Sequence, residues 1–302
     1  MTEPPTAVNR CLAAFHQALA GKVFCIDGVL WRTVGTSTVM TVPAAKPYPI
    51  GRKEVDRALR ESGCFFAQFA TPAQTGVVCK HSVLRDKGYS EQSLQRQFRQ
   101  TLHRGDQRLS VRSLTWDEVT AWAPHVVDAS RSRQGIHIPV NRDLWTKACE
   151  AGRTTSRLSA FGCHDGDVLV GFSLFMQDLN GYRAIHTSVR PDSFPHGAAN
   201  MLLYRSARLV IQRPDCDFVS FGHSGLPELP TVSRFKRHAG LVEEPLNLAV
   251  VLHPRLRWLL RMKTVTQGLS WVRAALRPGS RLARPWEGLA AAVATDLSLL
   301  PD

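Results

Sequence analysis

Hydrophobic residues recur every three or four positions in some segments of the chain and alternate with polar residues in others. The first pattern is typical of amphipathic helices and the second of half-buried strands. Helices are predicted over residues 1–20, 53–61 and 198–212, and from residues 89, 116 and 143 onward. Strands are predicted over residues 22–26, 29–34, 37–42, 64–69, 76–84, 109–114, 157–163, 168–177, 182–188, 217–221 and 246–252. Strands and helices follow one another along the chain, which predicts an α/β fold.

This pattern divides the 302 residues into two α/β halves, joined by a polar and basic stretch. The length is natural for two domains of about 150 residues each. We expect one domain over residues 1–130, a second over residues 131–253, and basic amphipathic helices over residues 254–302. A hydrophobic content of 44% and a mean hydropathy of −0.15 exclude a largely disordered chain.

Positive charge narrows the classes of partner. The chain has 38 lysines and arginines against 25 acidic residues, a net charge of +13. Such a surface attracts nucleic acid, anionic lipid or a nucleotide-bearing small molecule. Basic residues gather over 96–112 and again over 255–284, where they accompany an apolar helical stripe. That second cluster suits either a helix packed on the domain with a solvated basic face, or contact with a membrane surface or polyanion through residues 254–285.

Apolar runs such as Leu246–Leu252 are too short to span a bilayer. Residues 1–10 carry two prolines and a glutamate where a secretory signal needs a basic flank and an apolar core. The seven cysteines include no CxxC pair, so we expect reduced thiols and no metal site. A nucleophilic Cys79 or Cys163 is the weaker alternative. We expect a cytoplasmic protein that could also contact the inner face of the membrane.

The segment most informative about chemistry is a strand, the loop 190–197 and the helix that follows it. Backbone N–H groups at a helix start have no partner within the helix, so they can hold a phosphate, a carboxylate or a carbonyl oxygen. Gly197 allows a ligand to approach the backbone closely. We therefore expect a donor-binding site at Gly197, Ala198, Ala199 and Asn200, although an ordinary β-to-α turn has the same pattern.

The order of elements around this loop resembles the GNAT acyltransferase fold. The hairpin, third strand, loop, helix with Leu202–Tyr204 and strand ending at Gly222 are more narrowly similar to the Fem-type branch. That branch has two tandem domains and includes aminoacyl-tRNA-dependent transferases. Three further segments resemble it: the arginine-rich helix and following strand at 94–114, the segment 132–145, and the Phe-Lys-Arg motif at 234–240. The resemblance extends over residues 89–257.

The resemblance implies two tandem GNAT-like domains with mixed central sheets flanked by helices, the first degenerate and the second catalytic, followed by C-terminal helices. It also implies transfer of an acyl or aminoacyl group from acyl-CoA or aminoacyl-tRNA to an amine or hydroxyl by direct attack, with no tightly bound cofactor. GNAT enzymes place a Gln/Arg-x-x-Gly-x-Gly/Ala pattern at the loop. Here Phe194–Ala199 contains the glycine but not the rest of the pattern, so the donor need not be acyl-CoA.

Residue roles follow from the same resemblance. Lys236 matches the lysine of the Phe-Lys motif, which lies near the reacting carbonyl in Fem-type transferases, where a cation stabilises the developing oxyanion. The candidates for proton transfer are His186, Asp192, His196, Tyr204 and His223. We expect the amides around Gly197 and the Lys236 ammonium to face each other across one pocket. A GNAT-fold protein that only binds tRNA or an anionic membrane remains the alternative, and the sequence leaves the donor, the acceptor and the oligomeric state open.

Overall fold

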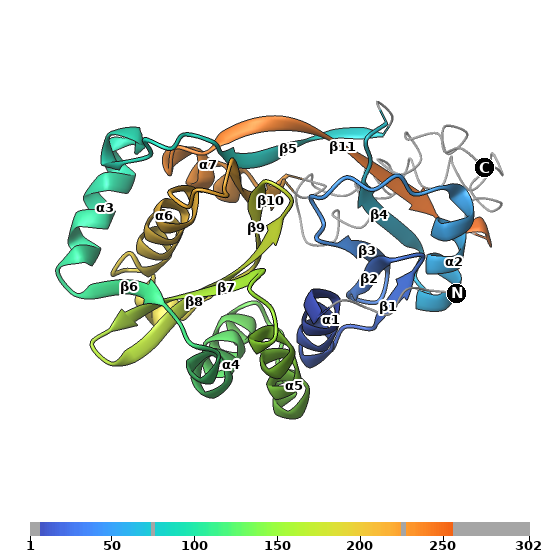
Figure 1. The fold of residues 1–302 in the computed structure, drawn as a ribbon, viewed down its shortest axis with the longest axis horizontal. Coiled ribbons are helices and arrows are strands. Elements are labelled where there is room, and N and C mark those ends of the chain that lie inside the picture. Colours follow the sequence, from blue (N-terminus) through green and yellow to red (C-terminus); the bar gives the residue numbers. More distant parts are fainter. Residues whose placement is uncertain (1–6, 74–75, 225–227, 256–302) are drawn as a thin grey trace, which may run out of the picture.

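The strands of the protein form one continuous mixed sheet. The computed structural model describes residues 7–73, 76–224 and 228–255. Within these ranges the eleven strands are ordered β1-β2-β3-β4-β11-β5-β10-β9-β8-β7-β6 (Figure 1). None of the helices in the described ranges is long and apolar enough to cross a membrane.

The first half contains a short antiparallel run of strands followed by a parallel crossover. Strands β1 to β3 pair antiparallel, and β3 pairs parallel with β4 after the crossover helix α2. The elements are α1 (Ala7–Ala18), β1 (Val23–Ile26), β2 (Val29–Val34), β3 (Thr38–Val42), α2 (Arg52–Ser62) and β4 (Phe66–Ala70). Helix α2 packs its apolar positions Val55, Ala58 and Leu59 against Trp31 and Phe69 of this sheet.

The second half repeats this arrangement on a larger scale. Strands β6 to β9 pair antiparallel, and β9 pairs parallel with β10 after the crossover helix α6. The elements are η1 (Glu91–Ser93), α3 (Arg96–Asp106), β6 (Leu109–Ser113), α4 (Trp116–Arg133), α5 (Arg142–Arg153), β7 (Leu158–Asp165), β8 (Val168–Asp178), β9 (Gly181–Val189), η2 (Pro191–Ser193), α6 (Ala198–Ile211), β10 (Phe218–His223) and α7 (Pro230–His238).

The last strand of each half lies in the sheet of the other half. Strand β5 (Val77–Leu84) follows β4 in sequence but pairs with β10, and β11 (Val242–Leu252) pairs with both β4 and β5. These two long strands cross the top of Figure 1 and connect the halves. The two sheets expected from the sequence are therefore joined into one.

Helices cover both faces of the second-half sheet. One core contains α3, α6 and the inward side chains of β6, β7 and β10, with Phe98, Leu102, Leu202 and Tyr204 buried within it. The other contains α1, α4, α5 and β8, where Phe15 of α1 packs against Trp145 of α5. Helix α1 thus belongs to the first half in sequence and to the second-half core in space.

Most predicted elements agree with the observed ones within a few residues. The expected domain boundary after residue 130 falls inside α4, and α3 and β6, which were expected in the first domain, pack and pair with the second half. Helix α7 was not predicted, because its sequence is mainly polar and contains Pro230. Proline is nevertheless tolerated at the first position of a helix, where Pro230 lies. Of the expected C-terminal helices at 254–302, residues 256–302 lie outside the described residues.

Candidate active site

Strands β9 and β10 separate and leave an opening in the second half. They pair only at residues 181–183 and 218–220, although β9 continues to Val189. The opening leads to a cavity of about 310 Å³, bounded by Ala184 to Thr187 of β9, Leu203 of α6, Phe221 of β10, and Val232, Phe235 and Lys236 of α7. Most of these side chains are apolar, so a charge inside the cavity is poorly screened.

A bulge in β9 gives the opening its shape. The register with β8 shifts between Leu174 opposite His186 and Phe175 opposite Ala184, which leaves Ile185 as the extra residue. Such a bulge leaves one residue unpaired and re-aims its neighbours. Ile185 packs on the core that contains α1, and the His186 ring contacts Phe15 of the same core. Two successive residues therefore pack towards α1, and both also line the cavity.

Lys236 brings the one ammonium group to this cavity among the residues the structure describes there. Pro230 begins α7, and Lys236 lies in its last turn, where a cation interacts favourably with the helix dipole. Its Nζ donates a hydrogen bond to the carbonyl oxygen of Phe221 at 2.6 Å. Burial lowers the pKa of Lys236 to about 8, against a smaller opposing effect of Glu243. The ammonium is therefore mostly charged at pH 7 and has donors left for a second acceptor.

The start of α6 lies elsewhere. Gly197 adopts a left-handed conformation with φ of +81°, and a Cβ there would lie 2.9 Å from the carbonyl oxygen of Thr101 on α3. Its N–H already donates to Phe194. Neither Gly197 nor Ala198, Ala199 or Asn200 lines the cavity in the described structure, so these amides and Lys236 do not face each other across it.

Two loop candidates for proton transfer are exposed and engaged with arginines. His196 Nε2 lies 3.4 Å from Arg108, which is itself paired with Asp165. Asp192 accepts hydrogen bonds from Arg190, and this interaction lowers the pKa of its carboxyl. Neither residue borders the cavity.

The other candidates are more buried. Tyr204 is fully buried, its ring packs on Tyr89 at 5.3 Å, and burial raises the pKa of its hydroxyl. His223 ends β10 and its Nδ1 lies 2.7 Å from the carbonyl of Ser224, while burial lowers its pKa. Burial also lowers the pKa of His186 to about 3. Of the proton-transfer candidates, His186 alone borders the cavity, and it is neutral at pH 7.

Several lining residues were not singled out from the sequence. Leu203, Phe221 and Val232 line the cavity, yet each has an ordinary apolar pattern. Only the Phe-Lys motif carried a signal, and it pointed to Lys236 and its neighbour. Separation of β9 from β10 depends on long-range pairing, which a local pattern does not encode.

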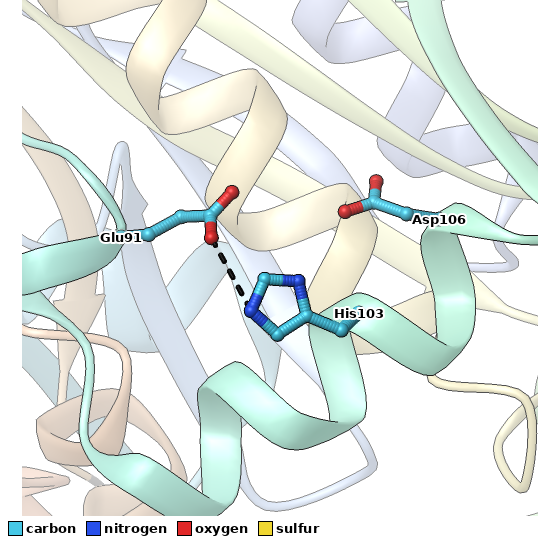
Figure 2. Close-up of side chains that lie close together, drawn as sticks. All are labelled: Glu91, His103 and Asp106. Atoms are coloured by element: carbon cyan, nitrogen blue, oxygen red, sulfur yellow. Dashed lines mark ion pairs between the residues drawn. The ribbon is translucent and has the colours of Figure 1, made fainter.

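A metal site and a cysteine nucleophile both find little support. The atoms of Glu91, His103 and Asp106 that could ligate a metal lie within 4.8 Å of one another (Figure 2). Glu91 is engaged with His103 at 3.5 Å, and Asp106 accepts from Arg205 at 2.8 Å, so arginine already supplies positive charge there. We assign no metal to this exposed group.

Cys79 and Cys163 are buried, and burial raises their pKa to about 11 and about 12. A thiol attacks as its thiolate, and a raised pKa makes that form scarce at pH 7. The environment of neither thiol therefore supports a cysteine-dependent enzyme.

Comparison with known proteins places this arrangement in context. No family model and no curated protein sequence matches the chain. Two solved structures match its fold at a TM-score of 0.50. One is the C-terminal DUF2156 domain of a protein from Agrobacterium fabrum described as a lysylphosphatidylglycerol synthetase, at 12% identity over 81% of this chain and 91% of that one. The other is FemX, at 9% identity over 82% of this chain and 92% of that one.

The chain shares the fold of FemX and of this DUF2156 domain, which is the Fem-like fold that the sequence predicts. The expectation from the sequence is confirmed at this level, since both structures are matched over nearly their whole length. The separated pair β9 and β10 belongs to the second GNAT-like half, which is the half predicted to be catalytic.

Proposed function

We propose that the protein transfers an acyl or aminoacyl group from an activated donor to an amine or hydroxyl, with the reacting carbonyl in the cavity between β9 and β10. The observation that carries this proposal is the position of Lys236. Lys236 lines an apolar cavity, and the carbonyl oxygen of Phe221 holds its charged Nζ where β9 and β10 part. A fixed cation in such surroundings stabilises negative charge more strongly than it would in water.

In the transfer step, the acceptor nitrogen or oxygen attacks the donor's carbonyl carbon and forms a new C–N or C–O bond. The carbonyl oxygen becomes an oxyanion, which the Lys236 ammonium stabilises. The bond between that carbon and the donor's sulfur or oxygen then breaks, and the leaving group takes the electron pair. The proton lost by the acceptor passes to the leaving group, directly or through water.

Among activated donors we favour an aminoacyl ester of tRNA over acyl-CoA. Pyrophosphate binding would need open amides at the start of α6. There the Gly197 N–H is already engaged, and the Thr101 carbonyl oxygen lies against the glycine. The net charge of +13 suits a polyanionic donor. The matched domain described as a lysylphosphatidylglycerol synthetase makes lysyl transfer to a phospholipid one case to test.

The test uses the full chain, tRNA charged with one labelled amino acid at a time, and labelled acetyl-CoA in parallel. Acceptors are vesicles containing phosphatidylglycerol, and free amines and alcohols. We expect label to move from tRNA to an acceptor. We also expect Lys236→Met to lower the turnover by about 10²-fold or more, the usual cost of losing an oxyanion donor.

The matched control is Lys53→Met, which removes an exposed lysine of α2 and should leave turnover unchanged. Transfer from acetyl-CoA alone would support acyl transfer and show that the donor is acyl-CoA rather than aminoacyl-tRNA. If no donor gives product while tRNA or vesicles bind with a steep dependence on salt, the protein is a binding protein and the proposal fails.

A further inference from the structure

A second, smaller cavity opens on the other side of the separated strands. It has a volume of about 80 Å³ and shares Ala184 and Ile185 with the larger cavity. Its remaining walls come from α1, from β2, from the chain that leaves β3, and from Ser220 and Gly222 of β10. This cavity therefore lies between the two halves and approaches the proposed site of transfer from the face opposite α6 and α7.

Arg32 of β2 borders this cavity without an acidic partner. Its guanidinium has five N–H donors, and its hydrogen-bond contacts are two long ones, to His16 Nδ1 and Met40 Sδ, each at 3.5 Å. In the described part of the chain no carboxylate forms an ion pair with it. Burial lowers the pKa of Arg32, and no counter-ion offsets that cost. An arginine held in this way is suited to an anion that comes from outside the chain.

The other charged groups of the cavity leave it positive. Arg183 borders it too, and donates to Asp178 at 2.8 Å and to the carbonyl of Ala45 at 2.9 Å. Asp178 is also paired with Lys46 at 2.7 Å, so this one carboxylate already serves two cations. His16 is buried and burial holds its pKa well below the usual value, so it is neutral.

We propose that the cavity around Arg32 binds an oxyanion, a phosphate or carboxylate group, and that this group belongs to the acceptor. The volume suits one small polar group and is far below that of pockets for larger ligands. Because Ala184 and Ile185 line both cavities, a group anchored by Arg32 lies next to the larger cavity. We infer that the neighbouring amine or hydroxyl of such an acceptor reaches the carbonyl beside Lys236. The assignment to the acceptor rests on the proposed function, whereas anion binding itself does not.

Anion binding is tested by thermal unfolding in sodium phosphate, sodium acetate and sodium chloride at equal ionic strength. A ligand that binds the native state raises the melting temperature in proportion to its saturation. We expect a saturable rise with phosphate or acetate beyond that with chloride, and the anion that produces it identifies the group. Arg32→Met should lose this rise. It should still fold, because methionine keeps the aliphatic contacts and removes a charge that lacks a counter-ion.

Arg57→Met is the matched control. It removes an exposed arginine of α2 that pairs with Glu61, and phosphate or acetate should raise the melting temperature of this variant as much as that of the wild type. The proposed anion site would be overturned if chloride raised the melting temperature as much as both oxyanions do. It would also be overturned if Arg32→Met kept the full rise in melting temperature.

A kinetic measurement tests the link to the acceptor. Once a transfer assay is in hand, Arg32→Met should raise the acceptor KM by about tenfold or more and change kcat less, since a charge-assisted contact to the acceptor is lost. Saturable anion binding with an unchanged acceptor KM would overturn the assignment to the acceptor. Saturable binding by a chain that transfers nothing would count against the proposed function and leave the anion site intact.

Discussion

The two halves of the molecule contain the same structural unit in two states. In the first half β3, α2 and β4 form a parallel pair joined by a crossover helix, and in the second half β9, α6 and β10 do the same. Each pair is hydrogen-bonded over three positions, at 38–40 with 66–68 and at 181–183 with 218–220. Beyond these positions the first unit is closed by its own chain, and the second is open.

Residues 43–50 close the first unit. The Tyr48 N–H donates to the carbonyl of Ala70 at the end of β4, and its hydroxyl donates to the carbonyl of Val42 at the end of β3, both at 2.9 Å. The corresponding chain of the second unit turns away towards α3, where Gly197 meets Thr101. The segment after the third strand thus closes the opening in the first unit and leaves it free in the second, which is where we propose the site.

The largest expected effect comes from closing the open unit. Val232→Trp adds bulk at the mouth of the cavity, on an exposed position of α7. It should lower turnover about 10²-fold, because displacement of the reacting group by about 1 Å has effects of that size. Leu229→Trp, just before α7 and outside the cavity lining, is the control. Equal turnover in both variants would show that the cavity is not the site.

The next prediction compares two glycines that flank the crossover helices, Gly197 before α6 and Gly63 after α2. Gly197→Ala should lower the free energy of unfolding by about 2 kcal/mol or more, because the left-handed backbone and the contact with Thr101 both oppose a Cβ. Gly63→Ala, at the end of α2, has a φ of +72° and open space around it. It should cost only about 1 kcal/mol. Equal losses in urea unfolding would mean that α3 does not press on the start of α6.

The pH dependence of transfer tests the charge of Lys236. Its pKa is lowered to about 8, so the ammonium loses its proton as pH rises through 8. The fraction charged falls about tenfold for each further pH unit, whereas arginine keeps its proton. The ratio of wild-type turnover to Lys236→Arg turnover should therefore fall about tenfold between pH 7 and pH 9. A constant ratio would mean that the ammonium is not needed.

The smallest effect concerns the closed unit. Tyr48→Phe removes the hydrogen bond to Val42 and should lower the free energy of unfolding by about 1 kcal/mol. Transfer should be unchanged, because the open unit carries the proposed site of transfer and Tyr48 lines neither cavity. Chemical denaturation and the transfer assay measure the two quantities on the same preparation, and a loss of turnover larger than the loss of folded protein would contradict this division between the halves.

Local pattern predicts the elements of this protein well because each helix and strand buries one face. The helix predicted over 198–212 is α6 at Ala198–Ile211, and the hairpin before it pairs as expected. The exchange of β5 and β11 between the halves could not be predicted. Pairing of β11 with β4 joins residues far apart in the sequence, and the apolar pattern of either strand suits several neighbours.

The candidate site was predictable only in part. Lys236 was found through its Phe-Lys motif, and it borders the cavity. Tyr204 and Gly197 suit a site in sequence, yet packing against Tyr89 and Thr101 occupies their surroundings. The bulge at Ile185 and the unpaired arginine at Arg32 follow from tertiary pairing, so a single sequence gives no signal for them.

The most direct measurement is a crystal structure of the protein with an adenosine that carries an aminoacyl group through a stable amide. The analogue's carbonyl oxygen should lie within about 3 Å of Lys236 Nζ, the distance of a hydrogen bond, with its acyl carbon between β9 and β10. Analogue bound only at the start of α6, or a cavity still empty at saturating analogue, would contradict the account.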